Sequence, residues 1–430
     1  MKKVTGLFDA EAYINSLNMF GIRLGLENVK KLFSAAGNPQ NSLKFIHIAG
    51  TNGKGSTGAM LECALRGTGL KTGFYTSPHL IDVRERFRVN GKTVSREIFD
   101  FYTRKLAGYA DKINATYFEF VTVLAAMIFQ AEKCDIVIWE TGMGGRLDAT
   151  NAVNPFVSVI TNIALDHQQH LGGTIAEIAR EKAGILKPDV PLFYGQLEPE
   201  AKEVILAKAA ELDIPAAGPQ EDTPLEFSAA ERPDGFSQQF IYQNKTIRLG
   251  LPGYMQRENF RIVYNVLKYL AENMQFRFDT ALSALEFCRW PARLDKIEKR
   301  IIVDGGHNPD GIRALTRSLE ELLPQEKFTI VFGAFKDKDA AQSLPLYQNI
   351  AAEFIMIPNF EEGRKCHTPE ELIALANALG FSASAAKSGT EAVEKALLQS
   401  SRRVLVSGSL FLAGEVLAAR GKLDHALDLC

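Results

Sequence analysis

The amino-acid sequence predicts an α/β protein, with a mostly parallel sheet in the N-terminal part of the chain and a second, smaller α/β domain after it. Three observations predict this class. Short apolar runs alternate with stretches of helical periodicity, the pattern of parallel strands joined by crossover helices. The 430 residues are too many for one typical core, so two domains are expected. A new alternation of the same kind begins near Trp290-Pro291.

Buried strands of the first domain are expected at short apolar runs. These runs are Phe45–Ile48, Thr72–Tyr75, Ile136–Trp139, Phe156–Ile160 and Pro191–Tyr194. Helices are predicted at Phe118–Gln130 and Ile175–Ala183, where apolar residues recur with helical spacing. In Arg86–Ser95, Asn90-Gly91 separates two β-like arms and predicts a hairpin. Because ligands of parallel sheets bind beyond the carboxyl ends of the strands, the polar residues after each run are candidates for a site.

The second alternation predicts the elements of the C-terminal domain. They are the strands Arg300–Val303, Thr329–Phe332, Glu353–Ile357 and Val404–Val406, and the helices Gly311–Leu323 and Pro369–Leu379. Before them, Ala217–Leu249 is richer in Pro, Asp and Gln and ends in one β-like stretch, Phe240–Leu249. We interpret this segment as a peripheral excursion and not as a domain boundary. The domains are therefore placed at residues 1–292 and 293–430.

The composition excludes several classes of protein. With 46% hydrophobic residues, 23% charged residues and a formal net charge of −2, the chain is not expected to bind nucleic acid or a membrane surface. Its five scattered cysteines contain no CxxC and indicate neither a disulfide framework nor a zinc site. Acidic Asp9 and Glu11 lie where a signal peptide needs an apolar core, and the apolar stretch near Val121–Phe129 is too short to span a bilayer. A cytoplasmic protein is expected.

The segment Ala49–Thr57 carries the most informative motif, Ala-Gly-Thr-Asn-Gly-Lys-Gly-Ser-Thr. It follows a predicted strand and precedes a helix-like segment, Gly58–Arg66. Glycines let backbone N–H groups point at one anion, the helix N-terminus adds positive potential, and Lys54 supplies a mobile cation for phosphates. A nucleoside triphosphate site is predicted, although Gly55 stands where a Ser or Thr usually follows the lysine. The alternative is a tight turn that happens to contain a lysine.

Two further motifs follow strands of the same sheet. Glu140 opens Glu-Thr-Gly-Met-Gly-Gly-Arg-Leu-Asp-Ala-Thr-Asn, where Arg146 offers a fork for phosphate or carboxylate. A carboxylate beside a phosphate loop is suited to Mg²⁺, whereas in isolation it would be a solvated loop glutamate. Asp166-His167 is either a metal-binding pair or a loop hydrogen-bond motif. His170 is interpreted as a loop residue.

Other candidates are ambiguous from their own residues. Lys182 lies in the helical pattern Ile175–Lys187, and from sequence alone a solvent-facing lysine is strongly favoured. The turn Asp304–Pro309 contains Asp and His three residues apart, and suits a metal, a nucleotide, a substrate amine or an Asx-type turn. The charged segment Phe335–Asp339 on its own indicates a solvated turn.

Taken together, these motifs resemble the folylpolyglutamate synthetase/dihydrofolate synthetase family, within the Mur-ligase superfamily. The resemblance runs from about Gly21 to the last predicted strand. Its motifs are Gly25-Leu26-Glu27, Gly50–Thr57, Ser77-Pro78-His79-Leu80, Glu85-Arg86, Phe118-Glu119, Glu140–Asn151, Asp166-His167, Glu181–Ile185, Trp290-Pro291-Ala292-Arg293, Asp304–Pro309, Asp337-Lys338-Asp339 and Gly408-Ser409-Leu410. It implies a phosphate-loop ATPase domain followed by a Rossmann-like glutamate-ligase domain, with ATP between them.

The resemblance also implies the activity, ATP-dependent ligation of L-glutamate to a folate, and of L-glutamate to dihydropteroate if the enzyme is bifunctional. The ATP-binding residues that it implies are Asn52, Gly53, Lys54, Gly55, Ser56, Thr57, Gln256, Asn259, Arg293 and Asp304. The implied ligands of Mg²⁺, two ions by family likeness, are Ser77, Glu140, His167 and Lys182 carbamylated by CO₂. K⁺ is a candidate monovalent ion.

The remaining site residues are likewise those of the family motifs. The folate-binding residues are Ser77, Pro78, His79, Arg86 and Phe118, and the glutamate-binding residues are His307 and Ser409. The catalytic residues are Lys54, Lys182, His167, Asp304 and His307. A monomer without a nucleic-acid or membrane partner is expected.

The chain departs from the family pattern at two positions. Met255 stands where the family usually has histidine in Gly253–Asn259, which removes a polar nucleotide contact and leaves room for weaker ATP binding. Gly306 stands where alanine is usual. The alternatives are a catalytically weakened nucleotide- or folate-binding homologue and a Mur-type ligase acting on another carboxylate. A generic phosphate-loop GTPase or kinase is least favoured, since it leaves Asp304–Pro309 without a role.

Overall fold

The computed structural model describes residues 8–17, 25–219, 227–232, 235–358 and 365–422. The chain divides into two compact units. Unit 1 contains Met1–Pro219 and Arg261–Ala281, and unit 2 contains Gln220–Phe260 and Leu282–Cys430. Residues 1–7 and 18–24 lie outside the described residues. The predicted start of the family resemblance, near Gly21, is among them.

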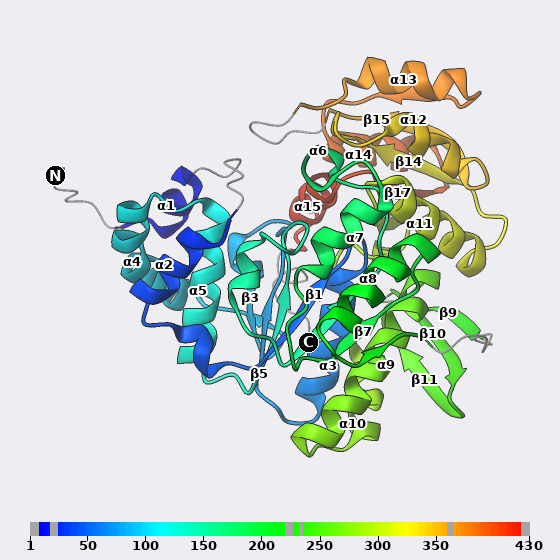
Figure 1. The fold of residues 1–430 in the computed structure, drawn as a ribbon. Helices are drawn as coiled ribbons and strands as arrows, with labels where there is room; N and C mark the ends of the chain where they lie inside the picture. The colour runs from blue at the N-terminus through cyan, green and yellow to red at the C-terminus, as the bar shows by residue number, and fades with distance from the viewer. Residues whose placement is uncertain (1–7, 18–24, 220–226, 233–234, 359–364, 423–430) are drawn as a thin grey trace. The chain divides into compact units, whose positions relative to one another are not determined.

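Unit 1 contains an eight-stranded sheet in the order β4-β3-β2-β5-β1-β6-β7-β8. Figure 1 labels β1, β3, β5 and β7 of this sheet. Its strands are β1 (Phe45–Ala49), β2 (Thr72–Tyr75), β3 (Phe87–Val89), β4 (Lys92–Thr93), β5 (Ile136–Glu140), β6 (Val157–Ile160), β7 (Leu192–Tyr194) and β8 (Ala216–Ala217). Strand β3 runs antiparallel to β2 and β4, and the other neighbours are parallel. The mostly parallel sheet and the hairpin at Asn90-Gly91 are confirmed.

The helices of unit 1 pack on this sheet and on one another. They are α1 (Ala10–Ser16), α2 (Glu27–Ala35), η1 (Pro39–Ser42), α3 (Lys54–Gly67), η2 (Val83–Arg86), α4 (Arg96–Ile113), α5 (Tyr117–Ala131), η3 (Ala149–Ala152), α6 (Gln168–Leu171), α7 (Ile175–Ala183) and α8 (Pro199–Glu211). Two more, α9 (Tyr254–Met274) and α10 (Phe278–Ala284), belong to both units. Helix α3 begins at Lys54, earlier than the predicted Gly58, because Gly53 turns the chain with φ +85°.

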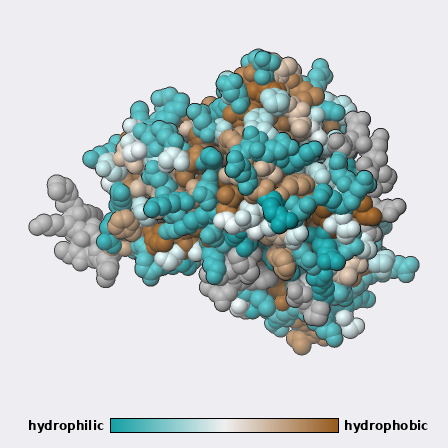
Figure 2. Space-filling view, turned by 90° about the horizontal axis from the view of Figure 1, so that it is seen from below, coloured by the Kyte–Doolittle hydropathy of each residue, from teal (hydrophilic) through white to brown (hydrophobic). Residues whose placement is uncertain are grey.

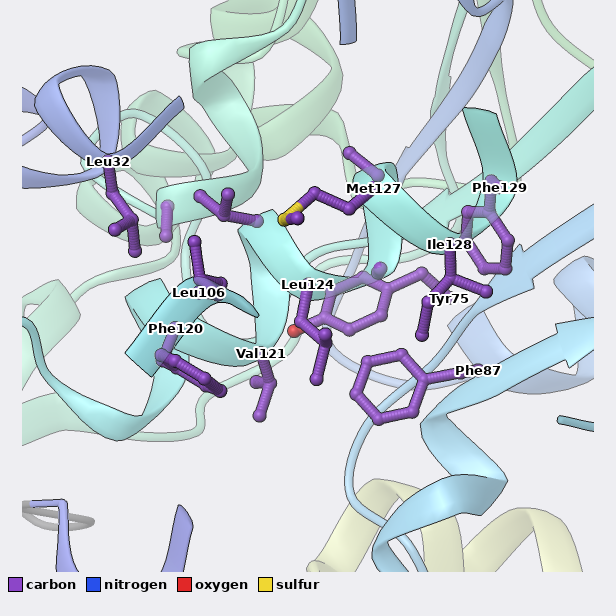
Figure 3. Packing of buried hydrophobic residues seen from close by; sticks show 14 of the residues in the cluster. Leu32, Tyr75, Phe87, Leu106, Phe120, Val121, Leu124, Met127, Ile128 and Phe129 are labelled. Carbon is purple, nitrogen blue, oxygen red and sulfur yellow. The ribbon is translucent and has the colours of Figure 1, made fainter. Parts of the chain in front are cut away.

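Helix α5 contributes many side chains to a large apolar cluster of unit 1. Its Thr116 N-cap and Glu119 exchange hydrogen bonds in a capping box, which starts the helix. Figure 3 shows Leu124 and its neighbours on α5 beside Tyr75 and Phe87, which come from the sheet. Burial of so many large apolar side chains stabilises this part of the unit by removing their surface from water.

Unit 2 contains two sheets. The six-stranded sheet has the order β12-β13-β17-β14-β15-β16, with only β12 antiparallel to its neighbour. Its strands are β12 (Asp295–Glu298), β13 (Ile301–Val303), β14 (Phe328–Phe332), β15 (Ala351–Met356), β16 (Ala383–Ala385) and β17 (Arg403–Ser407). Its helices are η4 (Leu285–Phe287), α11 (Pro309–Leu322), α12 (Ala340–Ser343), η5 (Leu344–Tyr347), α13 (Pro369–Ala378), α14 (Gly389–Gln399) and α15 (Leu410–Ala419).

The second sheet of unit 2 corrects the interpretation of Ala217–Leu249. Three antiparallel strands form it, β9 (Phe227–Arg232), β10 (Gly235–Tyr242) and β11 (Lys245–Leu249). The single stretch predicted at Phe240–Leu249 is thus two strands, separated by a turn at Gln243-Asn244 where both residues have positive φ. Since the boundary between compact units falls at residues 219 and 220, this segment is not an excursion of the first unit. Parts of it, residues 220–226 and 233–234, lie outside the described residues.

The surface and the thiols agree with an ordinary globular composition. The face shown in Figure 2 mixes hydrophilic and hydrophobic residues. None of the helices within the described ranges is long and apolar enough to cross a membrane. Cys63, Cys134 and Cys288 are buried. The division into functional domains at residues 292 and 293 stays a prediction.

Candidate active site

Four neighbouring strands of unit 1 end in the polar motifs of the predicted site. The strands β2, β5, β1 and β6 are adjacent in the sheet, and β5, β1 and β6 run parallel to one another. Ser77 follows β2, Glu140 ends β5, the phosphate loop Gly50–Thr57 follows β1, and Asn162 follows β6. The carboxyl ends of parallel neighbours meet at one edge of a sheet, so the structure brings these motifs together.

The phosphate loop has the geometry of an anion site. Gly53 is the left-handed N-cap of α3, and the N–H groups of the first turn of the helix point toward the loop. The Lys54 Nζ atom donates hydrogen bonds to the carbonyl oxygens of Gly50 and Thr51, at 3.1 and 3.3 Å. A Cβ atom at Gly50 would overlap the side chain of Thr161. The glycine there permits close packing of the loop.

The segment after β6 holds this loop in place. Asn162 accepts the N–H of Thr51 through its carbonyl oxygen at 2.9 Å and the N–H of Asn52 through its side chain at 2.7 Å. The Thr161 hydroxyl donates to the Asn52 carbonyl at 2.6 Å. Thr161 and Asn162 were not among the predicted site residues. Their position directly after a predicted strand is the signal that could have identified them.

Glu140 is a buried residue at the end of β5 and not a solvated loop glutamate. Its Oε2 atom accepts hydrogen bonds from the Thr76 hydroxyl and, at 3.3 Å, from the N–H of Ser77. Thr76, which was not a predicted site residue either, thus orients the carboxylate beside Ser77. Within the described ranges, no group of three or more His, Cys, Asp or Glu side chains could hold a metal ion. The oxygen atoms of the Glu140 carboxylate and of the Ser77 side chain nevertheless suit Mg²⁺, because this ion usually completes its coordination shell with water and substrate phosphates.

His167 and His170 are both exposed, the first at the start of α6 and the second within it. His167 is the exposed N-cap of α6 with φ +50°, and its N–H donates to Asp166 Oδ1 at 2.8 Å. His170, interpreted from sequence as a loop residue, instead lies in α6 itself. The short helix forms because the left-handed residue at its start redirects the chain.

Lys182 is buried, with 2% of its surface exposed, so the expectation of a solvent-facing lysine at this position is wrong. Burial lowers its pKa to about 7, and the positive charge of Lys54 lowers it further, while Asp166 and Asp148 oppose the shift. Lys182 lies four residues after buried Ile178, on the apolar face of α7. This spacing was the signal for burial, but Arg180 and Glu181 obscured it.

The segment after β2 is organised by Glu85. Its carboxylate accepts the N–H groups of Leu80, Ile81 and Asp82, at 2.9, 2.7 and 2.7 Å. The Arg86 Nε atom donates to His79 Nδ1 at 2.9 Å. Burial, assisted by the charge of Arg86, lowers the pKa of His79 to about 3, so the imidazole is neutral.

Phe118 connects the predicted folate residues with the loop after Glu140. A Cβ atom at Gly142 would lie within 2.9 Å of the Phe118 ring, so the glycine leaves room for the ring. The Phe118 ring centroid is 6.2 Å from that of Tyr75, at the end of β2. Phe118 therefore lies at the same sheet edge as the motifs after β2 and β5.

Unit 2 forms its own polar cluster after β13 and β17. The buried Asp304 carboxylate accepts the N–H of Leu294 at 2.9 Å and that of Gly306 at 2.8 Å. Burial raises the pKa of Asp304, and Arg293 opposes the shift. The His307 Nδ1 atom lies 2.9 Å from the Gly305 carbonyl oxygen, which holds the ring in one orientation. Asn308 caps α11, so the Asx-type turn and the polar cluster coexist.

Three further predicted residues of unit 2, Ser409, Gln256 and Asn259, lie close to this cluster or near the start of α9. Gly408 donates its N–H to Gly306 at 2.9 Å, and the next residue, buried Ser409, is the N-cap of α15. The Asn259 amide donates to Gln256 Oε1 at 3.0 Å, and both side chains are buried.

Met255, the main departure from the family pattern, packs against α11. Its Sδ atom lies 3.4 Å from the Ser318 hydroxyl.

The expectation of a solvated turn at Phe335–Asp339 is wrong in part, because Lys338 in this segment is buried. Its N–H donates to the Phe335 carbonyl at 3.0 Å, which folds the segment back on itself.

The phosphate-loop sheet and the second α/β unit are the parts of a Mur-type ligase. Residues 48–267 match the Mur ligase middle domain, and residues 292–410 match the Mur ligase glutamate ligase domain. The chain belongs to the folylpolyglutamate synthase/dihydrofolate synthase family. It is 34% identical over 361 residues to a dihydrofolate synthase/folylpolyglutamate synthase of Bacillus subtilis, covering 81% of this chain and 84% of the relative.

Solved structures agree with this assignment. The folylpolyglutamate synthase of Mycobacterium tuberculosis, complexed with ADP and AMPPCP, matches with a TM-score of 0.84 and 27% identity, over 96% of this chain and 99% of that one. The Escherichia coli protein FolC in complex with DHPP and ADP matches with a TM-score of 0.80 and 29% identity, over 96% of each chain.

Proposed function

We propose that this protein is an ATP-dependent ligase that joins the carboxylate of a folate to the amino group of L-glutamate. The observation that carries the proposal is the convergence of the phosphate loop, buried Glu140 and buried Lys182 in a chain of this family. A carboxylate is a poor electrophile because its charge is delocalised. Transfer of the γ-phosphoryl group from ATP gives an acyl phosphate and ADP. The glutamate nitrogen then attacks the acyl carbon, inorganic phosphate leaves, and the nitrogen loses a proton.

The residues of the phosphate loop have an electrostatic role in this reaction. Lys54 and the N–H groups at the start of α3 bind the phosphates and offset the charge on the transferring group. Glu140, Ser77 and His167 would hold Mg²⁺, which neutralises phosphate charge when bound. Buried Asp304 and the oriented His307 are proposed to bind nucleotide and glutamate in unit 2. Phe118, His79 and Arg86 are proposed to bind the folate.

We further propose that CO₂ carbamylates Lys182. A neutral amine is needed, because only its lone pair attacks CO₂ to form the carbamate and release a proton. With a pKa of about 7, much of Lys182 is neutral near physiological pH. For an ordinary lysine the neutral fraction is on the order of one in a thousand. No hydrogen bond from Nζ occupies the amine within the described part of the chain. Two Mg²⁺ ions, K⁺ and a cytoplasmic monomer complete the proposal.

Carbamylation of Lys182 is expected to rise with pH through about 7, at constant dissolved ¹³CO₂. Below this pKa the amine is protonated and unreactive, and above it the amine is neutral. The ¹³C NMR carbamate signal of the unliganded protein should be weak at about pH 6 and strong at about pH 8. Lys182→Arg should show no such signal. Equal signals at both pH values would contradict the low pKa.

Phosphate release from ATP, with glutamate and either tetrahydrofolate or dihydropteroate, tests the function. Turnover with both acceptors, with products confirmed by mass, supports a bifunctional enzyme, for which the DHPP complex of the E. coli protein is a precedent. Turnover with tetrahydrofolate alone supports a dedicated polyglutamylating ligase. Tight binding of nucleotide and folate without turnover would favour the weakened homologue, with Met255 the first residue to examine.

A further inference from the structure

The loop after Glu140 and the C-terminal turn of α7 are packed backbone against backbone. The N–H of Arg146 donates to the Glu181 carbonyl at 2.8 Å. A Cβ atom at Gly145 would lie 2.8 Å from that oxygen and 3.0 Å from the Lys182 carbonyl oxygen. A Cβ atom at Gly184 would overlap Arg146. The two segments therefore touch at glycines, and small changes in their separation would move Lys182 relative to the loop.

One side chain fastens the two segments together. The Asn151 Nδ2 atom donates to the carbonyl oxygens of Arg146 and of Gly184, each at 2.9 Å. Asn151 is buried, with 6% of its surface exposed, and its Oδ1 atom has no hydrogen-bond partner in the described chain. Within the described chain, the Asn151 side chain therefore acts as a donor of two hydrogen bonds, one to the loop at Arg146 and one to the end of α7 at Gly184.

The backbone of Asn151 is itself held relative to the loop. Its N–H donates to the Asp148 carbonyl at 2.8 Å within η3. The Asp148 carboxylate caps η3 through the N–H of Thr150 at 3.0 Å and accepts the N–H of Met143 at 2.9 Å. Because Met143 lies three residues after Glu140, this network fixes Asn151, the loop and the end of α7 as one assembly.

We propose that Asn151 is a positioning residue for ligation, which holds Lys182 at a fixed place relative to Glu140. The proposal rests on the proposed function, in which both side chains bind metal. Only an amide suits the position, because two carbonyl oxygens face one nitrogen. Aspartate has the same shape but would place a carboxylate oxygen against two carbonyl oxygens. Asn151 touches no reactant in this proposal and acts through Lys182.

Asn151→Asp is expected to lower kcat for ligation about 100-fold, since a displacement of about 1 Å in a catalytic group has an effect of this size. The KM for ATP should change little, because the phosphate loop is held by Asn162 and not by Asn151. The ¹³C carbamate signal of Lys182 should weaken in parallel with kcat. Asn41→Asp, an exposed asparagine of the same unit, is the matched control and should behave as wild type.

Circular dichroism and nucleotide binding show whether the variant folds. If Asn151→Asp does not fold, Asn151→Ala carries the test, because it removes both hydrogen bonds without adding a charge. A folded variant with wild-type kcat and carbamate signal would overturn the proposal, as would a kcat loss that merely equals the unfolded fraction. The wild-type protein tests the proposed function separately from the role of Asn151. Absence of ligation by the wild type would contradict the proposed function, and absence of its carbamate signal would contradict the modification of Lys182.

Discussion

Lys182→Ala is expected to abolish ligation, with kcat falling about a thousandfold. The variant has no amine to carbamylate, so it lacks the carboxylate proposed to hold the second metal ion. Lys182 is buried, and its removal leaves space for a small molecule at the same place. Formate or acetate should therefore restore part of the activity, in a saturable manner. The measurement is phosphate release against acid concentration at fixed ATP, folate and glutamate.

Lys182→Arg is the control for this rescue. Arginine cannot be carbamylated, because its guanidinium stays charged, and its side chain fills the space that the acid would need. It should be as inactive as the alanine variant and should not respond to formate. Full activity of Lys182→Ala without added acid would remove the basis for carbamylation. Loss of activity that no acid restores, in a folded protein, would leave only a structural role for the lysine.

Lys54→Ala is expected to remove ATP turnover, with kcat again falling about a thousandfold. Lys54 is the mobile cation of the phosphate loop, and in the structure its Nζ atom donates to the loop carbonyls of Gly50 and Thr51. Nucleotide should still bind weakly through the N–H groups at the start of α3. The measurement is phosphate release together with the affinity for a non-hydrolysable ATP analogue.

The matched control is Lys44→Ala. Lys44 is an exposed lysine that precedes β1, whereas the phosphate loop follows the same strand. It should retain wild-type turnover. Because Lys54 also lowers the pKa of Lys182, the Lys54 variant is assayed above pH 8 as well, where a larger fraction of the amine is neutral in both proteins. Near-wild-type kcat in Lys54→Ala would refute the assignment of the phosphate loop.

Much of the fold could be predicted because strands and helices were specified by nearby residues. The strand at Thr72–Tyr75 and the helix at Ile175–Ala183 have the predicted bounds. The Asn90-Gly91 hairpin also formed as expected, since Asn90 and Gly91 accept the positive φ that such a turn requires. The turn at Gln243-Asn244 was missed because neither residue is a glycine, and the positive φ values arise from pairing of β10 with β11.

The site was predictable where motif residues directly follow strands, as with Glu140 and the phosphate loop. The residues that support them were not predicted, although Thr76, Thr161 and Asn162 also come directly after strands. Thr76 orients Glu140, and Asn162 holds the phosphate loop, through contacts between segments far apart in the sequence. Asn151 likewise donates to one carbonyl oxygen 33 residues away in the sequence and to another five residues away. A hydrogen bond of this kind leaves no periodic pattern in the chain.

By itself, the sequence determined the α/β class, most of the strand and helix positions, the phosphate loop and membership of a ligase family. These depend on hydrophobic period, turn residues and ordered motifs, which act over a few positions. Only the tertiary structure decided that Lys182 is buried and has a pKa of about 7. Burial depends on which elements pack around a side chain, and the pKa follows because a low-dielectric surrounding disfavours the charged amine.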